Sequence, residues 1–423
     1  MKNKEPKVLI ISNNCLSRNG SNGKVLAEMF GKFKPENLAQ FYIHNENPDF
    51  SLCKKYYRVT DKQAVKSLVP FIKAGGEVPY CESGETAEDN AATKRQGHHN
   101  ALIFLIRDII WSLGFWRSGV LNWAKEFKPD LVFFQVGDSA FMPNIAVKIA
   151  KKLGVPLMLY CTENYYFKEH NYFTDKRFAF CYPFFRRRLV KAFKKLIGES
   201  KCEIYNSEFL AELYENEFGK KGKVIYQATS LKTFEGETGN DIYKFAYAGN
   251  LGLGRHISLI EVASVISSLN SEYKLDVYGN SAPEVKAALD ECENINYHGA
   301  VPYSEVISVM EKSDFLFHTE SFDKEMIKDS KTAFSTKIAD SLVSGRNFVL
   351  YADESLACTK YLLKYDCACV ITEKSQLEAK LTEFITSPDM QKKYRQKALE
   401  TASLNHNAEI NGEKFKDIVL ELV

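Results

Sequence analysis

The chain alternates between short apolar segments of strand length and longer amphipathic segments of helix length. The alternation runs in two blocks, separated by a polar, glycine-bearing stretch at residues 230–241. Strict β-α alternation implies parallel sheets with helices on both faces. A length of 423 residues also exceeds one ordinary core. We therefore predict an α/β fold of two doubly wound Rossmann-like domains facing a cleft, at residues 1–232 and 233–387. A helical segment at 388–423 would follow, with the option of crossing back to the first domain.

The strand-like segments share a run of buried-type residues and lie between helical segments. In the first block they are expected at 7–12, 40–43, 56–59, 131–136, 156–161, 203–205 and 223–226. In the second block they are expected at 244–248, 274–278, 295–298, 315–318, 348–351 and 368–371. The apolar stretch at 103–127 is predicted to be one helix, and further helices are expected at 303–312 and 336–343. The polar segment at 84–100 is expected to be a loop.

Composition excludes several classes of protein. The formal net charge is only +2, so global charge does not favour nucleic acid as a partner. The apolar run at 101–127 is interrupted by Arg107, Asp108 and Arg117, so it lacks the roughly 18 uncharged residues that a membrane-spanning helix needs. The apolar residues at 8–11 are too few for the core of a signal peptide. The ten cysteines are scattered and the histidines have no metal-ligand spacing. We expect a cytoplasmic protein with reduced cysteines and no metal.

A glycine-rich loop ending in an arginine follows the first strand of the second block. It contains Gly249, Asn250, Gly252, Gly254 and Arg255. Glycines let the backbone approach a phosphate closely, and an arginine at a helix start adds fixed positive charge. The spacing is not the full dinucleotide fingerprint, so an ordinary tight β-α turn is the alternative. We expect this loop to contact a diphosphate.

A second segment places a lysine in the first turn of a helix. Ser335 or Thr336 can cap the helix, so the helix dipole and the Lys337 ammonium would point at the same anion. Asp340 lies one turn later on the same face, where its carboxylate could accept both hydroxyls of a ribose. The alternative is an exposed Lys/Asp pair.

Further candidates follow strand ends in the same block. Gly279 comes directly after the strand at 274–278, and Glu320 comes shortly after the strand at 315–318. Ligands of doubly wound sheets bind beyond the carboxyl ends of the strands. The glycine-rich loop, Gly279 and Glu320 would therefore line one cleft, as expected of a nucleoside-diphosphate site.

The order and spacing of these segments resemble retaining GT-B glycosyltransferases, in the large family 4 branch that builds bacterial capsules, O-antigens and other polysaccharides. The resemblance covers nearly the whole chain. In the second block it is carried by Gly249-Asn-Leu-Gly, Leu275-Asp-Val-Tyr-Gly279, Asn296-Tyr-His-Gly299, Ser313-Asp-Phe-Leu-Phe-His318 and Phe334-Ser-Thr-Lys-Ile-Ala-Asp340. In the first block it is carried by Val8–Ser12, Pro129-Asp-Leu-Val-Phe and Asn206-Ser-Glu-Phe.

The resemblance implies a nucleotide-sugar donor on the second domain and an acceptor on the first. Arg255 and Lys337 would bind the donor diphosphate as catalytic cations, and Asp340 would bind the ribose. The chain also departs from the family pattern, which has two glutamates separated by seven residues. Asp340 replaces the second, and Thr332 stands at the first. Glu320 is the candidate displaced equivalent, with an insertion at 322–334, and as such would be a catalytic residue that contacts the sugar.

The first domain offers weaker candidates. The family often has a histidine after the 131–136 strand, where this chain has Gln-Val-Gly-Asp, so Asp138 is the nearest candidate for the reaction centre. Glu163 follows the next strand and has a loop carboxylate as its alternative reading. Gly20 and Gly23 could bring the first loop close to the donor phosphates.

Residues 178–195 combine aromatic side chains with a strongly basic helix. Such a helix can lie on anionic lipid, whereas the alternative is an ordinary surface helix. We expect peripheral contact with the inner membrane leaflet, next to a polyprenyl-linked acceptor.

The combined prediction is a metal-independent glycosyltransferase with no cofactor besides its nucleotide-diphosphate sugar co-substrate. It would transfer the sugar, with retention, to a glycan or lipid-linked acceptor in cell-surface polysaccharide synthesis. The alternatives are a GT-B sugar-nucleotide epimerase and a non-catalytic nucleotide-binding partner of a glycosyltransferase.

Overall fold

The chain folds into two compact units. Unit 1 comprises Met1–Tyr226 and Ala408–Val423, and unit 2 comprises Gln227–Asn407. The first unit is left after Tyr226, whereas the sequence prediction placed the boundary between residues 232 and 233. The computed structural model describes residues 5–18, 21–69, 72–80, 100–114, 119–173, 175–236, 238 and 240–423.

Unit 1 is built on an eight-stranded sheet in the order β4-β3-β2-β1-β5-β6-β7-β8. Neighbouring strands are parallel, except for β3 and β4, which are antiparallel. The strands are β1 (Val8–Ser12), β2 (Leu38–Tyr42), β3 (Lys55–Arg58), β4 (Gly76–Glu77), β5 (Leu131–Gln135), β6 (Leu157–Cys161), β7 (Cys202–Tyr205) and β8 (Lys223–Val224).

The central strands are buried on both faces, as expected for parallel strands between two helical layers. Every residue of β1 and β5 is buried. Alternate residues of a strand point to opposite faces. In β1, Leu9 and Ile11 therefore join one hydrophobic cluster, while Val8 and Ile10 join another.

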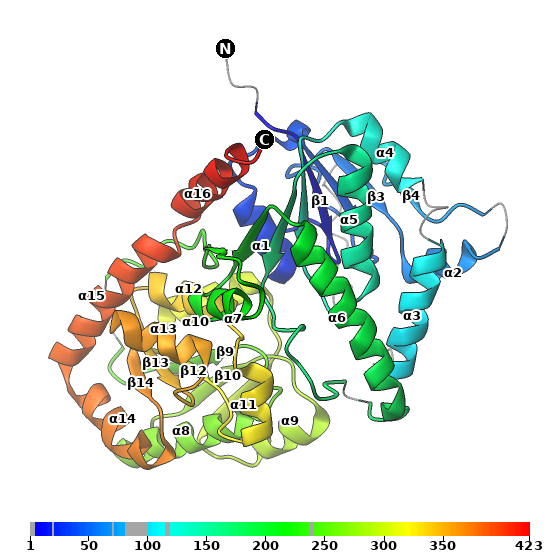
Figure 1. Ribbon diagram of the computed structural model, residues 1–423. Helices are drawn as coiled ribbons and strands as arrows, with labels where there is room; N and C mark the ends of the chain where they lie inside the picture. The colour runs from blue at the N-terminus through cyan, green and yellow to red at the C-terminus, as the bar shows by residue number, and fades with distance from the viewer. Residues whose placement is uncertain are drawn as a thin grey trace. The chain divides into compact units, whose positions relative to one another are not determined.

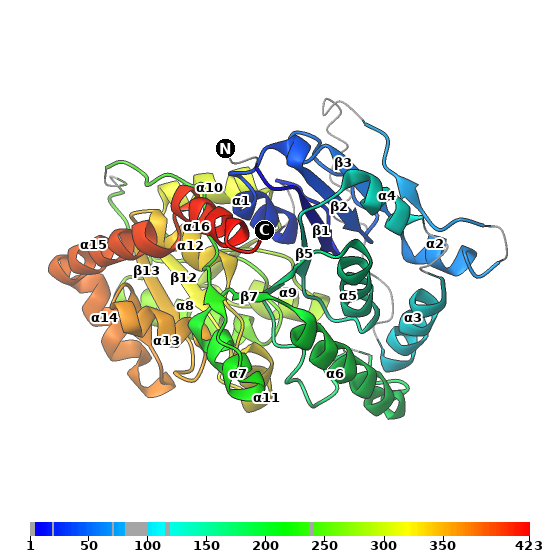
Figure 2. The ribbon, with the colours of Figure 1, turned by 45° about the horizontal axis from the view of Figure 1, so that its top comes forward.

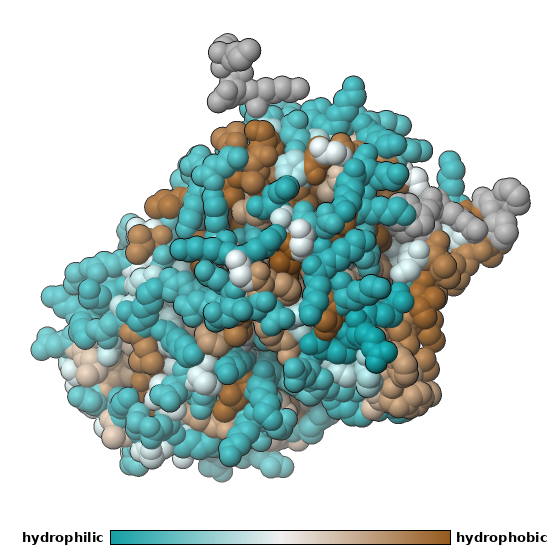
Figure 3. Space-filling view, in the orientation of Figure 1, coloured by the Kyte–Doolittle hydropathy of each residue, from teal (hydrophilic) through white to brown (hydrophobic). Residues whose placement is uncertain are grey.

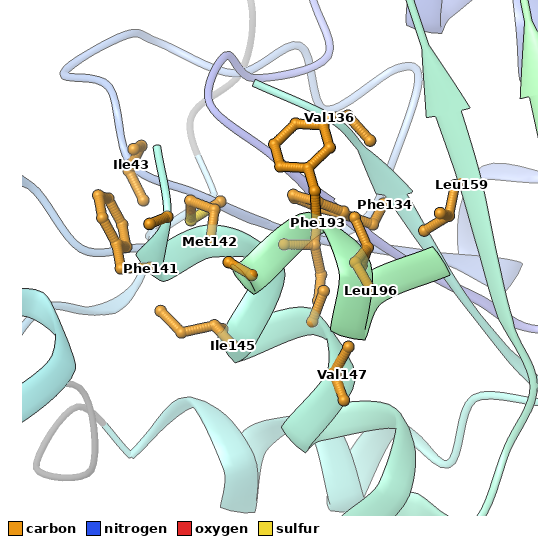
Figure 4. Packing of buried hydrophobic residues seen from close by; sticks show 14 of the residues in the cluster. Ile43, Phe134, Val136, Phe141, Met142, Ile145, Val147, Leu159, Phe193 and Leu196 are labelled. Carbon is orange, nitrogen blue, oxygen red and sulfur yellow. The ribbon is translucent and has the colours of Figure 1, made fainter. Parts of the chain in front are cut away.

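Helices cover both faces of this sheet. Figure 4 shows Phe141 and Met142 of α5, with Phe193 and Leu196 of α6, packed beside Phe134 of β5. In Figures 1 and 2, α5 and α6 lie next to each other. The helices of this unit are α1 (Ser21–Met29), η1 (Pro35–Asn37), α2 (Asp61–Lys66), α3 (Ala101–Gly114), α4 (Val120–Phe127), α5 (Phe141–Leu153), η4 (Ala179–Cys181), α6 (Tyr182–Glu199), α7 (Glu208–Phe218) and α16 (Ala408–Leu420).

The prediction of one helix over 103–127 was wrong. The structure has two helices there, because Gly119 has a left-handed backbone (φ 77°) and occupies the N-cap of α4. Such a conformation favours glycine and cannot continue an α-helix. The apolar pattern runs through both helices and concealed the break.

Unit 2 contains a six-stranded parallel sheet in the order β11-β10-β9-β12-β13-β14. Its strands are β9 (Phe245–Ala248), β10 (Leu275–Tyr278), β11 (Ile295–Gly299), β12 (Phe315–Thr319), β13 (Asn347–Tyr351) and β14 (Cys369–Ile371). Its helices are α8 (Arg255–Leu269), α9 (Pro283–Asp290), α10 (Tyr303–Lys312), α11 (Lys324–Ser330), α12 (Thr336–Val343), α13 (Ala357–Tyr365), η5 (Lys374–Gln376), α14 (Leu377–Thr386) and α15 (Pro388–Asn405).

Both sheets are doubly wound, so the prediction of an α/β fold with two Rossmann-like units is confirmed. The order of strands reverses between β1 and β5 in unit 1 and between β9 and β12 in unit 2. Such switch points open a crevice at the carboxyl ends of the strands.

The helical segment at 388–423 is divided between the units. Helix α15 belongs to unit 2, and α16 belongs to unit 1. There α16 packs beside α1, where the Phe415 ring lies 4.9 Å from the Phe30 ring (Figures 1 and 2). Within the part of the chain that the structure describes, no helix is both long and apolar enough to span a bilayer.

Candidate functional site in unit 2

The candidate site lies at the switch point of the unit 2 sheet. The glycine-rich loop follows β9, and Glu320 follows β12, its neighbour in the sheet. Two elements that are distant in sequence are thereby brought to the same edge. This is the position at which doubly wound sheets bind ligands.

The loop after β9 is shaped by an internal hydrogen bond and two left-handed residues. The Gly252 amide donates to Asn250 Oδ1 at 2.8 Å, which closes an Asx turn. Leu253 (φ 57°) and Gly254 (φ 73°) then reverse the chain, and Gly254 is the N-cap of α8. Arg255 is consequently the first residue of this helix, where the dipole favours an anion.

Arg255 is held by Glu320 in a buried, bidentate ion pair. Its Nε and Nη2 atoms donate to the two carboxylate oxygens at 2.9 and 3.0 Å, and the two side chains are 11% and 4% exposed. Both donors point to the carboxylate, so the planar guanidinium is fixed in orientation. Its remaining nitrogen, Nη1, lies 3.5 Å from the Asn250 carbonyl, beside the loop.

His318 supports the same carboxylate. Its Nε2 atom lies 3.1 Å from Glu320 Oε1. Burial lowers the pKa of His318, so the ring is neutral and Nε2 carries the proton that it donates. Burial alone would raise the pKa of Glu320, but His318 and Arg255 lower it to about 2. Glu320 is therefore a carboxylate at neutral pH, and both of its oxygens are engaged by the protein.

Lys337 occupies the first turn of α12, as predicted. The Ser335 hydroxyl caps this helix by accepting from the Lys337 amide. The ammonium lies 4.8 Å from the centre of the Tyr247 ring and 3.4 Å from its hydroxyl. A Cβ atom at Gly249 would lie 1.7 Å from Lys337 Nζ, so only glycine leaves room for the lysine here.

The charge of Lys337 is poorly balanced by the protein. Burial and the positive charge of Arg255 lower the pKa of Lys337 to about 7, although Glu320 acts in the opposite direction. Among the residues that the structure describes, no carboxylate lies within the 4.0 Å ion-pair distance of its Nζ atom. A half-buried cation with no carboxylate in direct contact, among the described residues, is an unfavourable arrangement that an anionic ligand would relieve.

Asp340 is engaged by other protein groups. Its Oδ1 atom accepts from the Thr229 hydroxyl at 2.5 Å, and its Oδ2 atom accepts from the Tyr303 hydroxyl at 3.0 Å. The residue is only 8% exposed. In this conformation both carboxylate oxygens have partners, and a ribose would compete with Tyr303, which is exposed. The ribose role of Asp340 stays a prediction.

Gly279 brings the next strand end against the glycine-rich loop. The Gly249 amide donates to the Tyr278 carbonyl at 2.8 Å, and the Gly279 amide donates to the Gly299 carbonyl at 2.7 Å. A Cβ atom at Gly279 would lie 1.8 Å from the Gly249 carbonyl oxygen. This close approach joins two segments of the protein backbone and orders the loop. The predicted approach of these glycines to a phosphate stays a prediction.

Among the unit 1 candidates, Asp138 lies at the switch point of its own sheet, because it follows β5. Asp138 lies in a half-buried loop, and the pKa of Tyr172 is raised by burial and, to a smaller extent, by the charge of Asp138. The neighbouring Gly137 would place a Cβ atom 2.5 Å from Asn13 Nδ2, in the loop after β1. Glu163 is half-buried after β6. The role of Asp138 at the reaction centre and the substrate-binding role of Glu163 stay predictions.

The structure describes Gly23, one of the two glycines predicted to lie near the donor phosphates. Gly23 is buried in α1, and a Cβ atom there would lie 2.7 Å from the Cys15 carbonyl oxygen. Gly20 lies outside the described residues. So does the predicted loop at 84–100, except for its last residue.

Sequence reasoning missed the residues that organise the site. His318 was part of a motif but had no assigned role, and Tyr247 and Tyr303 were read only as members of a strand and a helix. The contacts of the site join residues that are far apart in the chain and become visible only in the folded structure. Arg255 and Glu320 are 65 residues apart, and Lys337 and Tyr247 are 90 apart. Alternation of polar and apolar residues does not encode such pairs.

The fold is shared with solved glycosyltransferase structures of the GT-B type. Anabaena HepE, solved in complex with UDP-glucose, superposes with a TM-score of 0.64 at 11% identity, over 99% of this chain and 100% of that chain. Sucrose-phosphate synthase from Thermosynechococcus elongatus gives 0.64 at 10% identity, over 98% and 99%. The lipopolysaccharide outer core galactosyltransferase WaaB gives 0.51 at 13% identity, over 93% and 99%.

Sequence comparison adds nothing to this likeness. No protein-family model and no curated protein matches the chain. At such low identities the likeness establishes the GT-B fold. The chemistry has to be argued from the residues of this chain.

Proposed function

We propose that this chain is a glycosyltransferase that uses a nucleoside-diphosphate sugar as donor. The observation that carries the proposal is the Lys337 ammonium, which lies against Gly249 and has no carboxylate within ion-pair distance among the described residues. A cation, an oriented guanidinium and a helix N-terminus at one switch point suit a diphosphate. The UDP-glucose complex of the similarly folded HepE is consistent with this ligand class.

In the proposed reaction, the bond between the anomeric carbon and the diphosphate oxygen breaks, and its electron pair stays on the diphosphate. The acceptor hydroxyl forms the new glycosidic bond, and its proton goes to the leaving diphosphate. Lys337 and Arg255 would stabilise the developing negative charge. Transfer with retention and without a metal is part of this proposal. Within the described residues, no three His, Cys, Asp or Glu side chains form a metal-ligand group.

The geometry suggests a positioning role for Glu320. Since both of its oxygens bind Arg255, it would hold the guanidinium toward the diphosphate and leave little capacity for sugar hydroxyls. Glu320 would in that case act through Arg255, whereas the sequence resemblance assigned it to the sugar.

The acceptor belongs to the proposal as well. We propose a glycan or polyprenyl-linked acceptor in cell-surface polysaccharide synthesis, held by unit 1. Contact with an anionic membrane through residues 178–195 would place the chain at the inner leaflet, as a cytoplasmic protein. Support comes from the exposed basic face of α6, described below.

The test combines binding with turnover. Thermal shift with UDP, GDP, ADP and CMP identifies the nucleotide, and the corresponding sugar donors are then incubated with lipid-linked and glycan acceptors. The proposal expects acceptor-dependent release of the nucleoside diphosphate, unaffected by EDTA. Conversion of the donor without an acceptor would show an epimerase instead. Nucleotide binding without turnover of any donor would show a non-catalytic partner.

A further inference from the structure

Helix α3 of unit 1 exposes an aliphatic face. Ile103, Ile106, Ile109 and Leu113 are 43%, 46%, 43% and 66% exposed. Their spacing puts them along one side of the helix, and Ser112 is the other exposed residue among those described in α3. A surface helix of a soluble domain normally presents charged residues on this side. Figure 3 shows hydrophobic side chains gathered along the right-hand side of the view, where α3 runs in Figure 1.

The apolar surface continues onto the two elements that flank α3. On one side, Asp61 of α2 accepts hydrogen bonds from Arg107 Nε and Trp111 Nε1 of α3 at 2.9 and 2.7 Å. On the other side, the Phe104 ring of α3 lies 5.8 Å from the Phe185 ring of α6. These flanking elements add seven exposed apolar side chains: Val65, Leu68, Val69 and Ile72 from the α2 side, and Phe178, Phe180 and Phe184 from η4 and α6.

Positive charge borders this surface on α6. Five basic residues lie on the solvent face of that helix, in line with the exposed Phe184: Arg187, Arg188, Lys191, Lys194 and Lys195. Arg188 also pairs with Asp108 of α3, which ties the basic helix to the aliphatic one. Glu199 at the end of α6 is its one acidic residue, and it pairs with Lys151. The basic face therefore has no acidic residues interspersed along it.

We propose that α2, α3 and the start of α6 form one membrane-docking surface, in which the aliphatic face of α3 enters the headgroup boundary of an anionic bilayer. A bilayer offers both an apolar interior edge and a layer of negative charge. Exposed aromatic residues at the meeting of the two regions suit the interface between them. The inference rests on the proposed function only for its purpose, the approach to a lipid-linked acceptor. In this proposal α3 inserts into the bilayer, and the basic residues of α6 contact only the charged headgroups.

Flotation of the full-length protein with phosphatidylglycerol/phosphatidylcholine vesicles tests this surface. The double variant Ile106→Ser/Ile109→Ser removes aliphatic contact, and Leu404→Ser is its matched control, because Leu404 is 65% exposed on α15 of unit 2. We expect the double variant to lower the vesicle-bound fraction at least about tenfold and the control to leave it unchanged. Lys191→Ala should weaken binding about fivefold at low salt, and Lys392→Ala on α15 should not.

Several outcomes would overturn the proposal. Wild-type protein that stays unbound at low salt would contradict it, and so would equal binding to pure phosphatidylcholine. A dimer in sedimentation that dissociates in the Ile106→Ser/Ile109→Ser variant would assign the surface to a second copy of the chain. Nucleotide binding by the same variants is measured in parallel. Loss of vesicle binding with intact nucleotide binding separates this proposal from that for unit 2, and failure of one leaves the other standing.

Discussion

Lys337 is the residue whose protonation should report ligand binding most directly. With a pKa of about 7 in the empty protein, its amine is mostly neutral at pH 8. A bound diphosphate favours the charged form and raises this pKa. We expect uptake of up to one proton per nucleotide bound at pH 8. Calorimetric titration in buffers of different ionisation enthalpy measures it, and Lys337→Met should abolish it. Uptake that persists in this variant would assign the proton elsewhere.

The lowered pKa of Lys337 also makes the free energy of unfolding depend on pH. The pKa of Lys337 is lowered in the folded chain from an ordinary 10.5, so the unfolded chain binds more protons between about pH 7 and pH 10.5. The contribution of this group to the free energy of unfolding therefore increases as the pH rises through that window. Bound diphosphate, which raises the folded-state pKa, should flatten the dependence.

At the scale of elements, substitutions of two glycines at the ends of β9 and β10 should have different effects. One should change ligand binding and the other the free energy of unfolding. A Cβ atom at Gly249 would meet the flexible end of Lys337, whereas one at Gly279 would meet the backbone carbonyl of Gly249. Gly249→Ala should displace the lysine, weakening nucleotide binding at least about tenfold, with a change in unfolding free energy below about 1 kcal/mol. Gly279→Ala should cost more than about 2 kcal/mol, because the backbone itself must move.

Thermal unfolding and nucleotide titration of both variants check this prediction. Unchanged affinity in Gly249→Ala would mean that the lysine position does not matter for the ligand. Equal free energies of unfolding for the two variants would contradict the difference expected between a contact with a flexible side chain and a contact with the backbone.

Elements were predictable where local signals were strong. The sequence pattern gave α10 and α12 with their observed bounds, because Pro302 and Ser335 mark their starts and the apolar period is clear. The break at Gly119 was not predictable, since a lone glycine in an apolar pattern is often tolerated within a helix. The hydrogen bonds of Asp340 to Thr229 and Tyr303 were hidden for another reason, because they depend on tertiary contacts.

At the scale of the whole molecule, unit 1 is assembled from two separated stretches of chain. Helix α16 returns to it after unit 2, and Phe415, Ile418 and Val419 enter the cluster that contains Phe30 and Phe133. Removing residues 408–423 would expose that cluster. A buried side chain of this kind contributes about 1.5–3 kcal/mol, so the loss should amount to several kcal/mol.

Hydrogen exchange can localise this loss. Truncation after residue 407 should increase exchange in β1 and α1, while β9 and β12 stay protected, because the hydrophobic cluster of unit 2 includes no residue from α16. Ile410→Ser, which changes a 48% exposed position of α16, is the control and should leave exchange unchanged. Uniform loss of protection in both units would show that they do not fold as separate cooperative bodies.

The central claim is that unit 2 binds the diphosphate of a sugar donor through Lys337. Its most direct test is a calorimetric titration of the nucleotide selected by thermal shift into wild-type protein, Lys337→Met and Lys331→Met. Lys331 follows α11, is exposed, and lies six residues before Lys337 in the chain, so it matches the change in charge. The account predicts at least about tenfold weaker binding in Lys337→Met and wild-type affinity in Lys331→Met. Equal affinity in all three proteins, or no binding of any nucleoside diphosphate, would contradict it.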